Sequence, residues 1–211
     1  MAELQALGLK IVPVTVAGDL TVVGFNREEL TRLFNLAGGA QKKVAGPWLF
    51  ETMDKFLSAV IKAVRQVPPH RMQWTTPDRD RPLKVFCYHI LVDPIHVLDA
   101  IATHKYDCSF KLTYAEAAER FGSMEEVARF GEDVRRRLTE AASNLTDADF
   151  DKEIDGYAGK TNGNELLYQV LSHTAHHLRQ LYEMLRMIDI EPIQPLQQKD
   201  FDGISMPAAL W

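Results

Sequence analysis

The sequence predicts a mainly helical protein: a four-helix bundle that carries a β-hairpin and one further helix at its N-terminal end. From Pro47 onward, four long segments place apolar residues at helical spacing, whereas the first forty residues contain two β-branched runs around a turn. Because the four segments share no heptad register, we expect a bundle with at least one long connection. A chain of 211 residues with 46% hydrophobic content can build one good core with an appendage. We therefore expect three parts, at 1–40, 47–192 and 193–211.

The N-terminal part predicts a hairpin followed by a helix. The runs 10–16 and 20–25 are rich in Val, Ile and Thr, and the Ala-Gly-Asp at 17–19 is a turn signal between them. Asn26, with Glu29 three residues later, has the pattern of a capping box at the start of the helix. A lone two-stranded hairpin is marginal in water, so this element should be covered by the bundle or by a second chain.

Three amphipathic segments predict the first three helices of the bundle. The segment 48–67 has apolar residues at helical spacing and ends at a Pro-Pro pair. The segment 82–103 follows Asp80, a cap candidate, and contains Pro94, which should kink the helix or free a carbonyl group. The segment 123–144 opens with a Ser-x-x-Glu capping box.

The remaining segments predict connections, the last helix and a tail. A short helical candidate at 114–121 lies in the long connection between the second and third bundle helices. The stretch 147–157 has the composition of an acidic linker. Asn162 opens the last helix, which continues towards Pro192. The tail after this helix is more apolar than a free tail needs to be, so we expect it to wrap the bundle.

Two histidines in the last predicted helix carry the strongest chemical signal. His173 and His177 are four residues apart, which places both rings on one helix face, close enough to share one metal ion. They continue an apolar stripe, so both should turn inward. His176 belongs to a more polar face and is a candidate for the rim of a pocket.

The best third ligand is His89, in the second bundle helix. Asp93 and His96 follow it at one and two helical turns, so this helix can point a polar cluster into the core. Three protein ligands with an open position are typical of a catalytic metal site. Imidazole suits zinc, nickel, copper or iron, and we expect zinc or nickel. Catalytic residues are not identified; Asp93, His96 and His176 are candidates for orienting a ligand or transferring protons.

The alternative is a non-catalytic interaction or dimerisation module in which the histidines are structural. A lone histidine on an apolar helix face is usually a core or boundary residue. A pair at four-residue spacing, joined by a third from another apolar helix, favours metal binding over this alternative. His70 and His104 lie beside loop signals, so we expect them to face solvent.

Composition narrows the possible partners and cellular compartment. A net charge of −5 and a pI near 5.8 argue against a nucleic-acid footprint, and the basic run 135–137 shares its helix with acidic residues. No apolar stretch approaches about 20 residues, so we expect no membrane span. Two cysteines, Cys87 and Cys108, are too few for a disulfide scaffold, which makes a reducing cytoplasm the default. We expect Cys87 to act as a small buried hydrophobe.

The order of the histidines matches a known family. The matching features are His89 in the second bundle helix, His173 and His177 in the fourth, and Gln180 after them. Over about 47–192 the chain resembles the DinB/YfiT-like superfamily of helical-bundle metalloenzymes. The resemblance implies a divalent metal held by the three histidines and a small-molecule substrate. It also implies transferase or isomerase activity that depends on a low-molecular-weight thiol, as in some members; a hydrolase is the other metal-dependent class.

The N-terminal element resembles the C-terminal half of glutaredoxin-like proteins. The matching residues are Val12-Pro13, Gly18-Asp19, Gly24-Phe25 and Glu28-Glu29-Leu30. The resemblance implies a cis peptide bond at Pro13. The Cys-x-x-Cys motif of that family is absent here, so the element cannot perform thiol-disulfide exchange. Without its own half of a glutaredoxin-like sheet, it should complete a sheet with the same element of a second chain and so form a homodimer.

Overall fold

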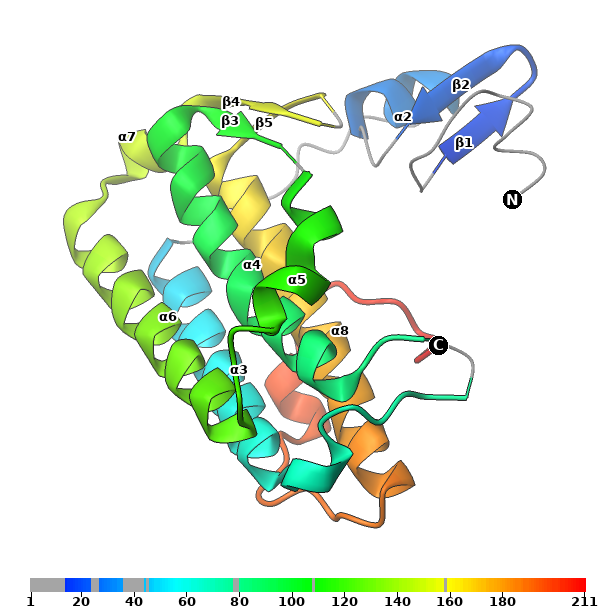
Figure 1. Cartoon of the computed structure of the whole chain (residues 1–211). Coiled ribbons are helices and arrows are strands. Elements are labelled where there is room, and N and C mark those ends of the chain that lie inside the picture. Colours follow the sequence, from blue (N-terminus) through cyan, green and yellow to red (C-terminus); the bar gives the residue numbers. More distant parts are fainter. Residues whose placement is uncertain are drawn as a thin grey trace.

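The computed structural model of the chain describes residues 14–23, 27–35, 44, 46–77, 80–107, 109–157 and 159–211. It is mainly helical, and four long helices form a bundle (Figure 1), as the sequence predicted. The bundle helices are α3 (Gly46–Gln66), α4 (Leu83–Thr103), α6 (Met124–Asn144) and α8 (Gly163–Met187).

The order of the helices around the bundle differs from their order in the chain. Both α3 and α4 pack extensively against α6 and against α8, whereas α3 and α4 contact each other little. Consecutive helices α3 and α4 therefore lie diagonally across the bundle. This arrangement makes α4 and α8 direct neighbours, so residues 84 positions apart in sequence can meet.

Helix α4 is the apolar centre of the fold. By length and composition it could cross a membrane, with a window of mean hydropathy 1.5, so the expectation that no apolar stretch approaches about 20 residues was wrong. Of that window, 78% is buried inside the structure. Because α6 and α8 flank the helix, its apolar surface is covered by protein, which accounts for its composition.

The helix starts show which capping predictions hold. The side chain of Asn162 accepts a hydrogen bond from the Glu165 amide at the start of α8. Ser123 accepts from the Glu126 amide at the start of α6, but the Glu126 carboxylate accepts from the Gly122 amide instead of completing the box. No side chain caps α4, so the prediction for Asp80 was wrong. Helix α4 continues through Pro94 to Thr103.

The predicted acidic linker at 147–157 is instead folded. It forms the helical turn α7 (Asp147–Phe150) and strand β4 (Glu153–Gly156), and β5 (Gly159–Asn162) follows. Strand β4 pairs in parallel with β3 (Lys105–Tyr106) and antiparallel with β5, which gives a three-stranded sheet. The linker prediction counted charges and missed that Phe150 and Ile154 are buried and anchor the segment to the core.

The connection from α4 to α6 contains the predicted short helix. After β3 come the 3-10 helix η2 (Ser109–Thr113) and then α5 (Tyr114–Ala118), which packs on the outer side of α4. Its buried residues form a second apolar cluster with α4, made of Val85, Tyr88, Val92, Tyr114 and Ala118.

The N-terminal element contains the predicted hairpin. Strands β1 (Val14–Ala17) and β2 (Leu20–Val23) pair antiparallel, and α2 (Arg27–Leu33) follows. Gly18 in the turn has a φ of +60°, a conformation that favours glycine. The element lies beyond the end of the bundle that carries the small sheet (Figure 1). The cis bond at Pro13, the Asn26 cap and Cys108 lie outside the described residues.

The C-terminal tail lies against α3 and α8. Phe201, at the end of the 3-10 helix η3 (Gln198–Phe201), packs edge-on against Phe56 of α3, with ring centroids 5.1 Å apart. The Tyr168 hydroxyl of α8 donates to the Gly203 carbonyl, at 3.1 Å. Further on, Arg179 of α8 donates to the Pro207 carbonyl. These contacts lead the end of the tail along α8.

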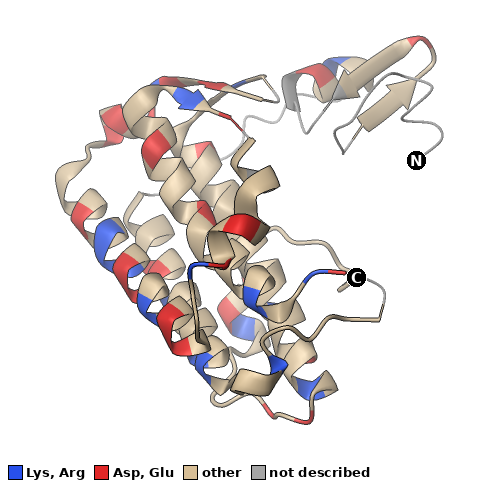
Figure 2. Ribbon diagram, viewed as in Figure 1, with Lys and Arg blue, Asp and Glu red and all other residues tan. Residues whose placement is uncertain are grey.

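Charges of both signs alternate along the exposed face of α6 (Figure 2). Arg135 forms a two-point ion pair with Asp54, with distances of 2.7 and 2.8 Å. Arg136 pairs with Asp133 and Glu140 on the same helix. The basic run at 135–137 is therefore part of a salt-bridged, solvated face.

Close helix packing at Gly131 generates the first prediction. A Cβ atom there would lie 2.8 Å from Ile61 and 2.9 Å from Leu91, both in the packed core. We expect Gly131→Val to lower the free energy of unfolding by about 1–3 kcal/mol, because overpacking outweighs the roughly 0.3 kcal/mol by which Val exceeds Gly in helix propensity. Chemical denaturation measures the change. Ala142→Val, at an exposed position of α6, is the control, and an equal loss there would contradict the packing explanation.

Candidate metal centre

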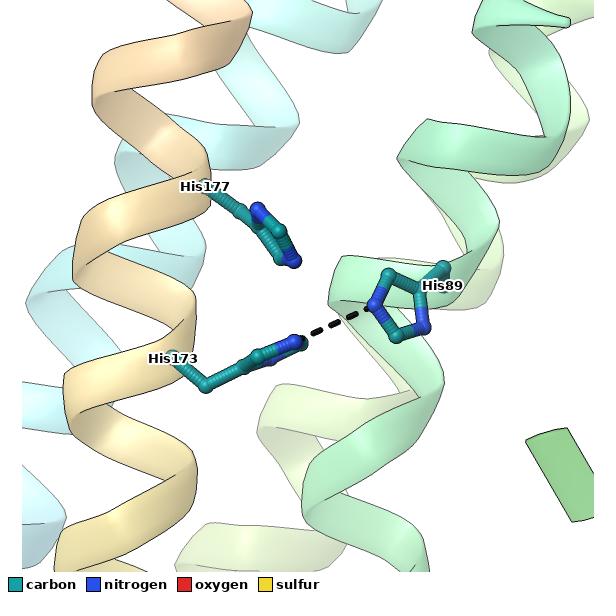
Figure 3. Close-up of side chains that lie close together, drawn as sticks. All are labelled: His89, His173 and His177. Carbon is teal, nitrogen blue, oxygen red and sulfur yellow. Dashed lines mark hydrogen bonds between the residues drawn. The ribbon is translucent and has the colours of Figure 1, made fainter. Parts of the chain in front are cut away.

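The three predicted histidines meet between α4 and α8, and their rings point toward one another (Figure 3). His89 comes from α4, and His173 and His177 come from successive turns of α8. Each offers one nitrogen, and these nitrogens all lie within 4.8 Å of one another. Nε2 of His89 lies 3.1 Å from Nε2 of His173. The structure therefore brings the three side chains together in a group that is positioned for metal binding.

The histidines differ in their exposure to solvent. His89 and His177 are buried, with 6% and 9% of their surface exposed. The His173 side chain is 33% exposed, so only one of the two α8 rings is fully turned inward as expected. The histidine group is thus shielded from solvent at His177 and reachable by solvent at His173.

Asp93 lies behind two of the histidines. It is 4% exposed and follows His89 by one turn of α4. Its Oδ2 lies 3.2 Å from Nδ1 of His173, and its Oδ1 lies 3.7 Å from Nδ1 of His89. A carboxylate behind the outer nitrogen of a histidine fixes the ring and its tautomer, which is the arrangement found around metal-binding histidines. The structure thus places Asp93 where it can orient ligands.

Gln180 plays the same part for the third histidine. Its Oε1 lies 2.5 Å from Nδ1 of His177, and its Nε2 donates to the Leu210 carbonyl, also at 2.5 Å. Because the amide nitrogen of Gln180 donates to the tail, its amide oxygen faces His177. The sequence singled out Gln180 by its position after His177, but gave no sign of its partner in the tail.

These contacts test whether the residues fit a metal ion. If Nδ1 of His173, which faces Asp93, and Nδ1 of His177, which faces Gln180, carry the ring protons, the Nε2 atoms of both rings carry lone pairs. The contact between Nε2 of His89 and Nε2 of His173 is a hydrogen bond when one of the two rings carries the proton, and a cation can take the place of that proton. In a tetrahedral site with metal–nitrogen bonds of about 2.0–2.1 Å, two ligand nitrogens lie roughly 3.3 Å apart, close to the 3.1 Å found here. The donor set fits a divalent transition metal.

The other candidate residues lie outside this group. His96 stacks on Phe110, with ring centroids 3.7 Å apart, two turns along α4 from His89. His176 is half-buried, and its ring centroid lies 5.7 Å from that of His177. His70 and His104 are exposed, as expected. Cys87 is fully buried, which raises the pKa of its thiol above the usual range and suits the predicted role as a small hydrophobe.

Sequence reasoning missed one side chain at the site. The hydroxyl of Tyr114 donates a hydrogen bond to Oδ1 of Asp93. Tyr114 is in the long connection, 21 residues from Asp93, so neither helical spacing nor a motif relates the two. The one available signal was a tyrosine at the start of an amphipathic helical candidate.

A small hollow lies near the start of α4. Phe86 of α4 packs edge-on against His177, with ring centroids 5.1 Å apart, and also lines the hollow. The lining residues are Thr76, Arg81, Phe86, Met184 and Trp211. None of the three histidines is among these lining residues, and Phe86 connects the hollow to the group through its contact with His177.

Comparisons with known proteins agree with this geometry. The model of the DinB superfamily matches residues 53–181, which include all three histidines. No curated protein matches the sequence. Among solved structures, the chain is similar to YfiT from Bacillus subtilis, with a TM-score of 0.55 and 15% identity over 73% of this chain and 95% of YfiT. YfiT is described as "a probable metal-dependent hydrolase with an unusual four-helix bundle topology". At this identity, the similarity shows a shared fold.

The neighbouring histidines of α8 provide a matched pair for a second prediction. We expect His177→Ala to weaken Zn²⁺ binding by at least about tenfold, because a ligand is lost. His176→Ala should leave the affinity unchanged, because that ring contributes no nitrogen to the group. Competition with a chromophoric chelator measures both. Equal weakening in the two variants would contradict the assignment.

Proposed function

The chain belongs to the DinB superfamily, and from this premise we propose that it is a metal-dependent enzyme that acts on a small molecule. One observation carries the proposal: three histidine nitrogens converge from two helices, and Asp93 and Gln180 hold the rings from behind. Rings placed only for packing would not need this convergence, so the geometry favours an enzyme over a module with structural histidines.

In this proposal, His89, His173 and His177 hold a divalent transition metal, with zinc or nickel preferred. When bound, the ion would polarise a substrate oxygen or stabilise a thiolate. A structural zinc site is usually closed by four protein ligands. Here Asp93 faces the Nδ1 atoms of His89 and His173, behind the rings, and accepts a hydrogen bond from Tyr114. Three ligands leave a position for substrate, which supports a catalytic site.

The reaction class that we propose is a thiol-dependent transfer or isomerisation. The family resemblance supports this reaction class. His176, half-buried beside the group, is a candidate for proton transfer. Hydrolysis is the second candidate, because YfiT shares the fold and is described as a probable hydrolase. We also propose a cytoplasmic setting, where a low-molecular-weight thiol would be available.

The proposal predicts the metal content and the activity of the purified protein. Elemental analysis should find about one transition metal ion per chain, and His89→Ala or His173→Ala should abolish it, because each removes one of three ligands. Removal of the ion by a chelator should abolish turnover, and Zn²⁺ or Ni²⁺ should restore it.

Two assays separate the reaction classes. One offers an electrophile together with cysteine or glutathione and measures loss of free thiol; the other offers activated esters and measures hydrolysis. His70→Ala, at an exposed position far in sequence from the group, controls for losing any histidine. Native protein that takes up no ion during titration with Zn²⁺ and Ni²⁺ would favour the interaction module.

We further propose that the N-terminal element joins two copies of the chain. Its sheet has two strands, and two apolar side chains on opposite faces of the hairpin are more than half exposed, Val16 at 52% and Leu20 at 61%. Open strand edges and exposed apolar side chains favour pairing with another chain. A second copy is the simplest partner, because the same element can complete both sheets by two-fold symmetry.

The dimer proposal predicts the mass of the protein in solution. Light scattering should give twice the monomer mass for the full chain and the monomer mass for a chain shortened to begin at Lys43. Loss of the paired edge is the physical reason. A monomeric full chain, or a shortened chain that dimerises with the same affinity, would show that the hairpin does not hold the subunits together.

A further inference from the structure

Tyr114 reaches the histidine group from outside the two helices that carry it. It is the first residue of α5, in the connection between α4 and α6. Its hydroxyl donates to Oδ1 of Asp93, and its ring lies against His89, with centroids 4.7 Å apart. A single side chain therefore touches both a proposed metal ligand and the carboxyl group behind the ligands.

The two oxygens of Asp93 have different partners. Oδ1 accepts the hydrogen bond from Tyr114, whereas Oδ2 lies 3.2 Å from Nδ1 of His173. The last torsion of an aspartate side chain has a broad energy minimum, so packing alone fixes the carboxyl plane poorly. A hydrogen bond to one oxygen holds that plane and keeps the other oxygen directed at His173.

We infer that Tyr114 is a positioning residue that acts through Asp93 to keep His173 in the Nδ1–H tautomer, with Nε2 available to the metal. The inference rests on the proposed function, because it takes the histidines to be metal ligands. Partners behind metal-binding histidines set the ring orientation and the tautomer, and losing one typically weakens metal binding about 10–100-fold. The Tyr114 hydroxyl has one hydrogen, and it donates this hydrogen to Asp93. The effect of Tyr114 on metal binding therefore passes through the carboxylate.

The surroundings of Tyr114 suit this role. The side chain is 8% exposed and packs in the second apolar cluster, beside Tyr88 at a centroid distance of 6.1 Å. Close packing fixes the ring and hence the direction of the hydroxyl. Burial, and next the charge of Asp93, raise the pKa of Tyr114 above its ordinary value, so the hydroxyl stays a donor.

The first test removes only the hydroxyl. Zn²⁺ affinity is measured on the full chain, stripped of metal, by competition with a chromophoric chelator. Tyr114→Phe should raise the dissociation constant about tenfold, at the low end of the effect of such partners. Tyr88→Phe, a buried tyrosine of the same cluster, should leave it unchanged. Unchanged affinity in Tyr114→Phe, or equal loss in both variants, would overturn the inference.

A double-mutant cycle separates positioning from general packing. Asp93→Asn replaces the acceptor that faces His173 and should weaken Zn²⁺ binding by about 10–100-fold. If Tyr114 acts through Asp93, adding Tyr114→Phe to this variant should have little further effect. Effects of the two substitutions that multiply would show that Tyr114 stabilises the site independently of Asp93, which overturns the inference.

A measurement without metal distinguishes this inference from the proposed function. Nitrogen-15 NMR of the metal-free chain reports the tautomer of each histidine ring. His173 should be mainly Nδ1–H in the native chain and should shift toward a mixture in Tyr114→Phe, whereas Tyr88→Phe should match the native chain. An unchanged tautomer in Tyr114→Phe overturns the inference alone. A native chain with the expected tautomer that binds no Zn²⁺ overturns the proposed function and, with it, the role toward metal.

Discussion

Asp93 is 4% exposed and belongs to a helix that is mostly apolar and mostly buried. A carboxylate so placed is stable only if its oxygens have hydrogen-bond donors. The donors come from different parts of the chain: Tyr114 from α5 and His173 from α8. Removing one partner of a buried charge typically costs about 3–5 kcal/mol. The relative positions of α4, α5 and α8 are therefore tied to one side chain, and the same contacts turn the histidine nitrogens toward one another.

The order of the helices in the bundle makes these contacts possible. Because α3 and α4 lie diagonally, α4 has α8 as a neighbour and keeps its outer side free for α5. The connection from α4 to α6 is long, and it is the segment that carries Tyr114. The small sheet joins the start of this connection, at β3, to the segment β4–β5 before α8. The sheet thus fixes the connection between α4 and α6 to the start of α8, at one end of the bundle.

The tail contributes to the site from the opposite direction. The Leu210 carbonyl accepts a hydrogen bond from the Gln180 amide, whose oxygen contacts His177. The orientation of this proposed ligand therefore depends on a backbone group 30 residues beyond Gln180. Contacts of Phe201 and Gly203 with the bundle lead the tail to that point. Two of the three histidines are therefore oriented through partners from segments other than their own. Rings held in this way lose little further freedom when an ion binds, which favours a well-defined coordination geometry.

The sequence by itself determined the helices and the three histidines. Apolar spacing located α3, α4, α6 and α8, and the four-residue interval put His173 and His177 on one face, because helical periodicity is a local property of the chain. Only the tertiary structure decided what surrounds the histidines. The order of the helices, Tyr114 on Asp93, and Leu210 on Gln180 depend on segments that meet after folding, and no spacing rule relates them. The same holds for the sheet at 153–162, where two buried apolar residues outweighed an acidic composition that suggested a linker.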